Sequence, residues 1–504
     1  MDELNKSCDI LVIGGGGSGL VAGCRAAFLG KQVIVLEKTK NLGGGMNNAS
    51  TMRTFGSQWQ KERNLPDTSM LYLRKRMDET FWRIDRKLAT NIIRGTGEFF
   101  DWFCQIAPRE YLDYFRVGRY VFDEEEDGPL GPQSERGPQG GKGSGRIFVE
   151  VCSEKLKELG GEILTEAVTQ DVIVENGKIT AAIVKQGEDT LTIACKAVIL
   201  ACGAWIRNPE MVEKFYPQLL AAQPYMGESP HQNRAYTGDG LPFARKAGAK
   251  MDETNLTIRM MGPMTMSRSR VLGGMSSSPY CVYVNKNGQR FVSEVSQLRM
   301  GVFDSGSVQV EQPEGKAYVI FDDAGIRQTI LNGDDQPKPQ VAMPPMMAPT
   351  FPKDLDEAYE DIDRGLAEGG DTVKKCDTLE EVAAFIDVPF AALKETMDNY
   401  NAYCQDGKDW DCYKPEEWMQ PINAPYYVVK ASLGTDGAFG GVEIDGNIQA
   451  LAADGGVVDG LYVTGDLASS RFINMAGIKK QIINDMSFAL SSGFLAGTNA
   501  AAAV

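Results

Sequence analysis

The chain has 504 residues, of which 43% are hydrophobic and 24% charged, a composition typical of globular proteins with sizeable buried cores. Its formal net charge of −16 disfavours binding to nucleic acid or to an anionic membrane surface. The sequence has no run of about 18 apolar residues and begins with an acidic segment unlike a secretory signal, so we expect a cytoplasmic protein without a membrane span.

Cysteine and histidine usage narrows the chemistry. The ten cysteines include no C-x-x-C pair, which argues against thioredoxin-like pairs, zinc ribbons and c-type haem attachment. The single histidine, His231, argues against a histidine-rich metal centre. We therefore predict no metal site.

The first forty residues carry a βαβ pattern. Residues 10–13 and 33–36 are apolar runs typical of buried strands, and residues 20–28 between them have helical character. Such a unit requires a right-handed crossover and a parallel sheet.

A glycine-rich turn joins the first strand to the helix in the pattern G-x-G-x-x-G. Its glycines allow a tight turn, a close approach of backbone to a pyrophosphate, and close helix packing. Glu37 ends the second strand about 20 residues on, where a carboxylate accepts hydrogen bonds from ribose hydroxyls. Together these features predict a dinucleotide site. The turn comprises Gly14, Gly16, Gly17, Ser18 and Gly19.

The rest of the chain falls into three regions. Residues 68–103 and 148–159 are predicted to be helical, and strands are predicted at 168–174, 179–185 and 191–200, with a hairpin turn at Asn176-Gly177. From about residue 255 to 430 the βαβ order is lost, and methionine and proline become frequent. A short strand at 461–463 and a helix of small residues at 487–503 end the chain.

Several segments resemble the flavoprotein family of fumarate reductases and succinate dehydrogenases, and they follow one another along the whole chain in the expected order. They are the NLGGGMN loop at 41–47, VILACGA at 198–204, TGDG at 237–240, the VN-x-x-G-x-RF-x-x-E stretch at 284–294, GLYVTGD at 460–466 and the closing helix at 487–497.

This resemblance implies an α/β protein in which a Rossmann-like FAD-binding domain is split in sequence by an inserted α+β capping domain. The expected segments are 1–254, 255–430 and 431–504 for the first FAD-binding part, the cap and the second FAD-binding part. Besides the turn and Glu37, the implied FAD contacts are Lys38, Gly43, Gly44, Gly45, Met46, Val168, Ala201, Cys202, Gly203, Thr237, Asp239, Gly465, Asp466 and Ser487.

The family chemistry is hydride exchange between flavin N5 and a carbon beside an activating group, and reduction of a C=C bond also needs a proton donor. Fumarate reductases use an arginine shortly after the RF-x-x-E stretch, and Arg299 is the nearest match, one residue later than the family spacing. Ketosteroid dehydrogenases of the same fold use tyrosines, so Tyr236 and Tyr283 are further candidates.

The substrate is not expected to be fumarate. Where fumarate reductases carry two substrate histidines, this chain has the segment 261–263 and Gly437. A buried dicarboxylate without paired cations is costly. The methionine-rich cap suggests a larger, more apolar substrate, although most of these methionines are expected to be core residues. Candidate substrate residues are Arg290, Arg471 and Phe439.

Our leading hypothesis is an FAD-dependent reductase of an activated C=C bond in an enoate or enone of moderate size. Electrons would come from an external donor, because the sequence has no second G-x-G-x-x-G. The alternatives are a ketosteroid-type dehydrogenase running the reverse desaturation, and a flavin-binding electron carrier without turnover. We expect a small-molecule substrate and an electron donor as partners, and neither nucleic acid nor membrane.

Overall fold

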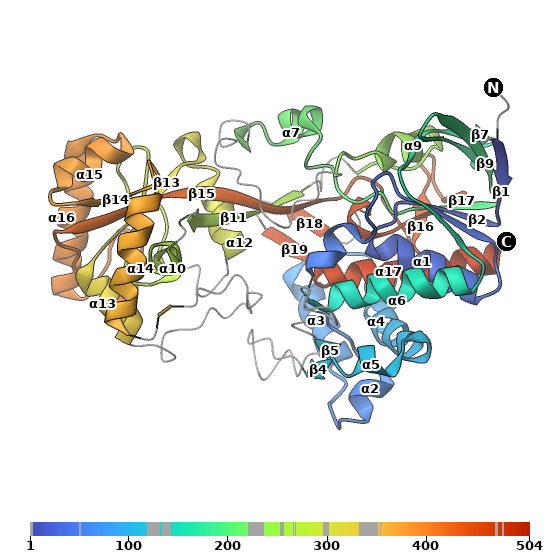
Figure 1. Ribbon diagram of the computed structural model, residues 1–504, viewed down its shortest axis with the longest axis horizontal. Coiled ribbons are helices and arrows are strands. Elements are labelled where there is room, and N and C mark those ends of the chain that lie inside the picture. The colour runs from blue at the N-terminus through green and yellow to red at the C-terminus, as the bar shows by residue number, and fades with distance from the viewer. Residues whose placement is uncertain are drawn as a thin grey trace. The chain divides into compact units, whose positions relative to one another are not determined.

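In the computed structural model, a six-stranded sheet brings together strands from both ends of the chain (Figure 1). Every residue of β2, β3 and β10 is buried, as expected for parallel strands covered on both faces, and this explains their continuous apolar sequences. The strands predicted at 10–13 and 33–36 are confirmed. In spatial order the strands are β16 (Gln449–Leu451), β17 (Val457–Val463), β10 (Ala197–Leu200), β2 (Ile10–Ile13), β3 (Val33–Leu36) and β6 (Glu162–Leu164).

Helices α1 (Gly17–Phe28), α6 (Gly143–Glu158) and α17 (Asp485–Ala503) pack beside one another (Figure 1). The contact of α17 with α1 is close: a Cβ on Gly493 would lie 2.4 Å from the Ser18 carbonyl oxygen, and one on Gly497 would lie 2.3 Å from that of Ala22. Backbone therefore touches backbone, and the last helix of the chain is fixed to the first. All three helices were predicted, and each begins a few residues earlier than expected.

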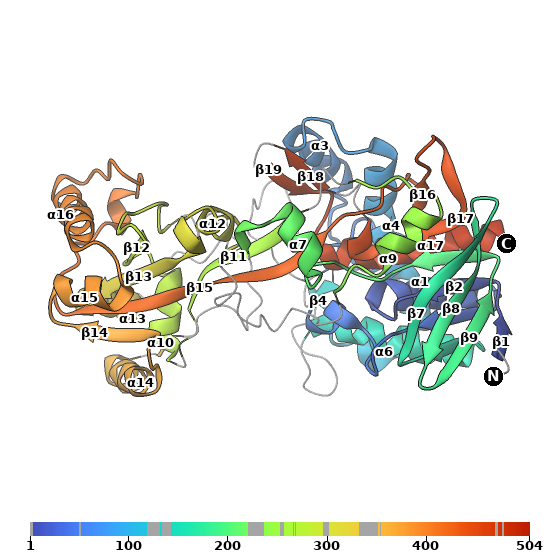
Figure 2. The same ribbon diagram turned by 90° about the horizontal axis from the view of Figure 1, so that it is seen from above.

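A second, four-stranded sheet lies in the same part of the fold (Figure 2). The hairpin at Asn176-Gly177 is confirmed, with φ values of 52° and 77°. The single strand predicted at 191–200 is wrong, because the chain changes sheets at Cys195-Lys196 and pairs first with β1 and then with β2. The strands in order are β1 (Leu4–Ser7), β9 (Asp189–Ala194), β8 (Lys178–Gln186) and β7 (Ala167–Glu175).

The continuous helical region predicted at 68–103 is also wrong, because it forms two helices, α3 (Ser69–Glu79) and α4 (Arg86–Ile106). Between them Phe81 and Trp82 have φ values of 51° and 59°, in the left-handed region. That conformation costs about 1–2 kcal/mol per residue for a side chain with a Cβ. The second helix then begins at Asp85, whose side chain accepts a hydrogen bond from the Leu88 N–H at 2.7 Å.

The middle of the chain forms a different, five-stranded sheet whose strands β12 to β15 pair antiparallel. Along β12, Tyr283 faces one apolar core while Val282 and Val284 face another, so helices cover both faces. The strands are β11 (Thr257–Thr265), β12 (Val282–Asn285), β13 (Ala317–Asp322), β14 (Val373–Cys376) and β15 (Tyr426–Phe439). The helices are α10 (Arg270–Gly274), α13 (Asp323–Leu331) and α14 (Leu355–Glu368) on one face, and α15 (Leu379–Ile386) and α16 (Phe390–Asp406) on the other.

Shorter elements complete the described fold. They are α2 (Gln58–Lys61), α5 (Arg109–Leu112), α7 (Pro209–Phe215), α9 (Gly240–Lys246), α12 (Val302–Gln309), β4 (Arg116–Val117), β5 (Pro132–Gln133), β18 (Phe472–Met475) and β19 (Ile478–Gln481). The structure describes residues 4–49, 52–117, 132–133, 143–219, 236–252, 257–265, 267, 269–295, 302–331, 351–352, 354–468, 472–475 and 478–504.

The chain divides into two compact units. Unit 1 comprises Met1–Met211, Pro230–Ile258 and Gly437–Val504, and unit 2 comprises Val212–Ser229 and Arg259–Asp436. The predicted α/β fold class is confirmed, whereas the predicted segment boundaries stay a prediction. Within the described ranges, no helix has the length and apolar character needed to cross a membrane.

The contact between α1 and α17 can be tested by adding one methyl group. Gly493→Ala places a Cβ against the Ser18 carbonyl, and we expect a loss of about 1–3 kcal/mol in the free energy of unfolding. Urea unfolding would measure it. Ala502→Ser, which adds one atom at an exposed position of the same helix, is the matched control. Equal stability of the two variants would contradict the close packing.

Candidate functional site

The glycine turn lies where β2 meets α1, and three backbone segments approach one another there. Gly14 has a φ of 114°, and a Cβ on it would lie 2.2 Å from the Ala201 carbonyl oxygen. A Cβ on Gly19 would lie 2.0 Å from the Gly14 carbonyl oxygen. A side chain at either glycine would force these segments apart, so the first and third glycines of the pattern are required by packing.

The N-terminus of α1 is open toward a negatively charged group. The N-cap residue Gly16 supplies no side-chain bond to the first-turn N–H groups, and no acidic residue stands in that turn. Apart from the adjacent residues of the chain, no atom of the described residues lies within 4 Å of the place a Cβ on Gly16 would take. Free N–H groups at a helix N-terminus favour a phosphate. Gly17 instead packs closely on Met46, 2.6 Å from where its Cβ would stand.

Glu37 follows β3 and directs its carboxylate back to the glycine turn. Oε2 accepts a hydrogen bond from the Gly15 N–H at 3.0 Å, and Oε1 accepts one from the Thr39 N–H at 2.8 Å. Because a carboxylate has roughly four acceptor sites, Glu37 keeps capacity for two ribose hydroxyls. Val168 lies close by, since the N–H of its neighbour Ala167 donates to the Glu37 carbonyl at 2.9 Å.

Lys38 connects this strand to the turn that carries the TGDG sequence. Its Nζ lies 2.7 Å from Thr237 Oγ1 and 2.7 Å from Asp239 Oδ2, and the Thr237 hydroxyl donates to Asp239 Oδ1 at 2.6 Å. The three side chains form a closed, partly buried hydrogen-bonded triangle. Two predicted cofactor segments, distant by about two hundred residues, are thereby held together.

The loop at 43–46 contacts both the glycine turn and Tyr236. The Gly43 N–H donates to the Gly15 carbonyl at 2.8 Å. A Cβ on Gly45 would lie 2.1 Å from the Tyr236 hydroxyl, and one on Gly203 would lie 3.2 Å from its ring. Burial, together with the negative charge of Asp466, raises the pKa of Tyr236. The phenol is therefore protonated at neutral pH.

Cys202 packs in the same place as an uncharged thiol. Its Sγ donates to the Ile13 carbonyl at 3.3 Å, and a Cβ on Gly240 would lie 3.1 Å from that sulfur. Burial raises the pKa of the Cys202 thiol to about 12, and the Asp239 carboxylate acts in the same direction. A thiol that stays protonated is a poor nucleophile, so Cys202 serves for packing.

The C-terminal segment completes the site. A Cβ on Gly465 would lie 2.7 Å from Ser18 Oγ, and the Gly465 N–H donates to Ser492 Oγ at 3.2 Å. Ser487 Oγ accepts a hydrogen bond from the Arg53 N–H at 2.7 Å. Ser492 and Arg53 could not be predicted from the sequence, because neither stands in a recognisable motif. Asp466 is held in this segment by its backbone carbonyl, which accepts a hydrogen bond from the Gly440 N–H at 3.0 Å.

All predicted FAD-contacting segments thus lie in unit 1. An open helix N-terminus, a carboxylate with spare acceptor sites and a backbone cradle lined by glycines are the features that a dinucleotide needs. The residues present therefore fit FAD.

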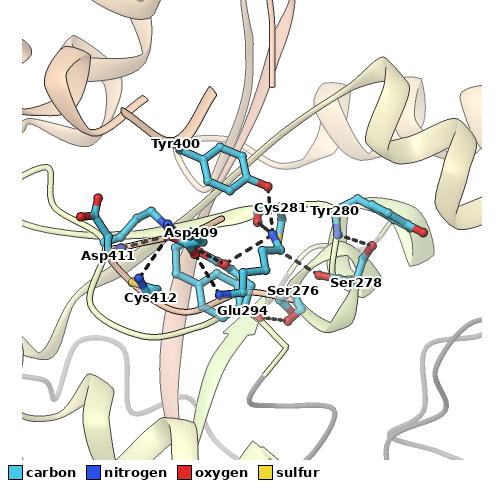
Figure 3. A network of polar contacts seen from close by, with 12 residues as sticks. Ser276, Ser278, Tyr280, Cys281, Glu294, Tyr400, Asp409, Asp411 and Cys412 are labelled. Atoms are coloured by element: carbon cyan, nitrogen blue, oxygen red, sulfur yellow. Dashed lines mark hydrogen bonds and ion pairs between the residues drawn. The ribbon is translucent and has the colours of Figure 1, made fainter. Parts of the chain in front are cut away.

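Arg290, a predicted substrate residue, lies in a buried network in unit 2, where it pairs with Glu294 and Asp409, both labelled in Figure 3. Its guanidinium bonds both Glu294 oxygens, at 3.0 and 2.9 Å, and both Asp409 oxygens, at 2.9 and 2.8 Å. The Lys414 ammonium lies 3.4 Å from Glu294 and donates to the Tyr400 hydroxyl at 3.1 Å. Four of its five N–H donors are thus taken up by the two carboxylates, and this geometry favours a structural role for Arg290, whose substrate contact stays a prediction.

Tyr283 has a related placement. Its side chain is fully buried, its N–H donates to Glu294 Oε1 at 3.2 Å, and its hydroxyl donates to the Ser276 carbonyl. Burial raises the pKa of Tyr283 well above its ordinary value. This placement favours a structural role over proton donation. Asp409 and Lys414 stand in no recognisable motif and lie more than one hundred residues further along the chain, so sequence reasoning missed them.

Other candidates fall outside what the structure describes. Arg299, Arg471 and His231 lie outside the described residues, and of Phe439 only the backbone is described. Their predicted roles stay predictions.

Comparison with known proteins identifies similar chains. The family model described as "FAD binding domain" matches residues 9–476. The NADH:acrylate oxidoreductase of Vibrio harveyi is 27% identical over 523 residues, covering 92% of this chain and 48% of that protein. The vinyl phenol reductase of Lactiplantibacillus plantarum is 24% identical, covering 92% and 90%. The chain thus spans about half the length of the first relative.

Two solved structures share the fold. The open conformation of a flavocytochrome c3 fumarate reductase matches with a TM-score of 0.69 and 23% identity, covering 99% of this chain and 78% of that one. A 3-ketosteroid-delta4-(5alpha)-dehydrogenase from Rhodococcus jostii RHA1, in complex with 4-androstene-3,17-dione, matches with a TM-score of 0.69 and 20% identity, covering 99% and 98%.

The Lys38 triangle predicts a specific loss of cofactor binding. Lys38→Met removes the bond that joins the first βαβ unit to the 237–239 turn, and we expect the dissociation constant for FAD to rise about tenfold, as for loss of one charged hydrogen bond. Fluorescence titration of the apoprotein with FAD would measure this. Lys40→Met, at an exposed position two residues on, is the matched control, and equal affinities in both variants would refute the role of Lys38.

The buried network predicts a distinctive pH dependence of stability. Burial alone would raise the pKa values of Glu294 and Asp409, but the charge of Arg290 outweighs it and holds both below their ordinary values. Their contribution is therefore present above the ordinary carboxyl pKa and is lost as pH falls through the folded values. Arg290→Gln should cost about 3–5 kcal/mol at pH 7 and should weaken this acid-side loss, because the buried carboxylates then favour protonation.

Urea unfolding at pH 7, 5 and 4 would measure both effects. Arg94→Gln removes an exposed pair with Glu98, and we expect little change from it. Arg290→Lys provides a milder variant in case the first does not fold. Parallel pH profiles for the wild type and both Arg290 variants would contradict the role of the network.

Proposed function

The chain belongs to the FAD binding domain family, and from that premise we propose that it reduces the activated C=C bond of an enoate or enone of moderate size. It is an FAD-dependent oxidoreductase, and its cofactor is FAD. Two of the relatives are named for acrylate and vinyl phenol, which are both compact conjugated alkenes. Others are named for fumarate, urocanate and 3-oxosteroids, so the names alone do not choose the substrate.

The observation that carries the proposal is Tyr236, a protonated phenol between two glycines of the FAD site. Reducing a C=C bond requires a hydride on one carbon and a proton on the other. Reduced FAD supplies the hydride when it is bound. The protein must supply the proton, and a phenol that lies against Gly45 and Gly203 is a candidate donor with the required protonation state.

Arg299 remains the second candidate donor. A guanidinium loses its proton reluctantly, with an intrinsic pKa above about 12, so it would need a neighbouring acid to reprotonate it. The reaction rates of variants at Tyr236 and Arg299 distinguish the two donors.

The choice of substrate class follows from the absence of residues that would bind a dicarboxylate. At positions 261–263 and 437 the chain has no histidine, and Arg290 is held by two carboxylates. A substrate with two carboxylates would then lack these cations. A single carboxylate or an uncharged carbonyl avoids that cost, which favours an enoate or enone over fumarate.

Anaerobic reoxidation of the reduced flavin tests the reaction class. The FAD-loaded protein is reduced chemically, and flavin absorbance is followed after addition of acrylate, 4-vinylphenol, 2-cyclohexenone or fumarate. We expect reoxidation by at least one of the first three and none by fumarate. If no acceptor reoxidises the flavin, the proposal fails and an electron-carrier role gains support.

Variants identify the proton donor in the same assay. Tyr236→Phe and Arg299→Ala are compared, and loss of the true donor should slow reoxidation by about 10²–10⁴-fold. Tyr462→Phe is the matched control, because it removes another partly buried phenol whose hydroxyl donates to the Asn499 carbonyl at 3.3 Å. Unchanged rates in both test variants would exclude both donors.

Oxidation of 4-androstene-3,17-dione with a dye as electron acceptor tests the reverse reaction. The likeness in fold to the steroid dehydrogenase is the reason to include it. Turnover in this direction without reduction of any enoate or enone would replace the proposed reductase by a steroid-type dehydrogenase.

A further inference from the structure

A set of apolar and basic side chains stands exposed on α3 and the turn after it. Met70 is 70% exposed, Phe81 65% and Trp82 57%. Arg74 and Asp78 follow Met70 at helical spacing on the same exposed face, and the Trp82 indole N–H donates to Asp78 Oδ1 at 3.0 Å. These side chains therefore form one continuous stripe that runs from the start of α3 to the turn.

The turn holds its two aromatic side chains outward on a strained backbone. Phe81 and Trp82 both have positive φ, where glycine or asparagine would be free of strain. Helix α3 ends there through hydrogen bonds from the Phe81 N–H to the Asp78 carbonyl and from the Trp82 N–H to the Met77 carbonyl. Neither bond needs an aromatic side chain. Strain kept at an exposed position points to a use for the side chains themselves.

The surroundings of this turn are basic, although the whole chain carries a charge of −16. Residues 69–94 contain seven basic and three acidic side chains. Arg74, Arg83 and Arg86 are exposed, and none of them has an ion pair within the described part of the chain. Three guanidinium groups without an ion pair among the described residues, beside two exposed aromatic rings, are well suited to an acidic protein surface.

A second exposed aromatic pair provides a contrast. Trp410 and Tyr413 are 66% and 78% exposed, and Tyr413 also has a positive φ of 56°. Their neighbours include Asp406, Asp411 and Glu416. Exposed aromatic side chains and a strained backbone occur at both turns, so the basic surroundings are what distinguishes the turn at Phe81 and Trp82.

We propose that the surface formed by Met70, Arg74, Phe81, Trp82, Arg83 and Arg86 docks an acidic one-electron carrier protein that supplies the electrons for the reaction. This inference rests on the proposed function, since reduction of each C=C bond consumes two electrons and two protons. Two reduced carrier molecules would each dock, give up one electron and leave oxidised, and solvent would supply the protons.

The rigidity of the turn favours a protein over a lipid surface. The Trp82 ring is fixed by its bond to Asp78, so little side-chain freedom is lost when it enters a matching pocket. A fluid bilayer gains nothing from such fixation.

The test measures reduction of the bound FAD before any acceptor is added, so that its outcome does not depend on the substrate. The FAD-loaded protein is mixed anaerobically with dithionite-reduced flavodoxin, an acidic one-electron carrier, or with reduced methyl viologen, a small molecule that needs no docking surface. Flavin absorbance is followed with the carrier spectrum subtracted, at low and at high salt.

Two double variants address the two parts of the surface. Phe81→Gly with Trp82→Gly removes the rings and relieves the positive-φ strain, and Arg83→Glu with Arg86→Glu reverses the charge. The negative charge at Arg86 lies at the first position of α4, where it favours the helix. Trp410→Ala with Tyr413→Gly is the matched control in acidic surroundings.

We expect both test variants to slow reduction by flavodoxin about tenfold or more at low salt. Both should keep the wild-type rate with methyl viologen. The glycine variant should also unfold at or above the wild-type temperature. The control pair should match the wild type with both donors. Equal flavodoxin rates in wild type and test variants overturn the proposal, as does a wild type that is reduced by methyl viologen and not by flavodoxin.

Sedimentation with vesicles of phosphatidylglycerol and phosphatidylcholine tests whether the surface binds a membrane instead. Binding that both test variants lose, without any effect on flavodoxin rates, would replace the carrier protein by a lipid surface. Failure of the proposed function alone would appear differently: the flavin would be reduced normally by both donors, and no acceptor would reoxidise it.

Discussion

Contact of backbone with backbone around the glycine turn is the constraint on which unit 1 depends. The Gly14 and Ala201 segments approach so closely that a single Cβ would lie 2.2 Å from a carbonyl oxygen. The same applies on the other side of α1, where Gly493 and Gly497 admit α17. Residues from the start, the middle and the end of the chain are therefore brought to one place by the absence of side chains, and this leaves N–H groups free to meet a phosphate.

Unit 2 is held together by a different principle, the balance of buried charge. Arg290 and Lys414 provide two positive charges, Glu294 and Asp409 two negative ones, and all four side chains are almost completely buried. Burying charges is costly unless each is paired and hydrogen-bonded. The network meets this condition by joining β12, the segment after it and the loop at 409–414. The network fixes the positions of these segments relative to one another, because a shift of any one of them would leave a buried charge without its partner.

The parts of the fold that could be predicted from sequence are those whose cause is local. The glycine turn, β2, β3 and Glu37 follow from a pattern that stands within thirty residues, and the hairpin at Asn176-Gly177 follows from two. The strand predicted at 191–200 failed because its break depends on the bend between β1 and β2, almost two hundred residues away. The helical region at 68–103 failed because Phe81 and Trp82 adopt a conformation that their side chains disfavour.

In the candidate site, too, the residues of local motifs could be predicted, whereas contacts between distant residues could not. Lys38 and Thr237 could be chosen because each stands in a motif, but their contact with each other could not be read from either motif. Arg290 was chosen as a substrate residue for its charge and its place in a family motif. Its partner Asp409 stands 119 residues further on, in a sequence without any distinguishing pattern. An arginine that binds substrate and one that is neutralised in a core look alike until the partner is seen.

The identity of the proton donor then depends on a property that burial controls. The environment that keeps Tyr236 protonated, through burial and the charge of Asp466, also makes its phenolate costly. A raised pKa therefore secures the proton at neutral pH and at the same time weakens Tyr236 as an acid. Tyr236 can act as donor only if the developing charge on the substrate carbon is more basic than the buried phenolate, as it is for a carbanion beside a carbonyl or carboxylate. An activated alkene therefore meets that condition despite the raised pKa of the phenol. Its carbonyl or carboxylate also stabilises the negative charge that hydride addition creates, which an unactivated alkene cannot do, so the restriction to activated alkenes comes from the hydride step.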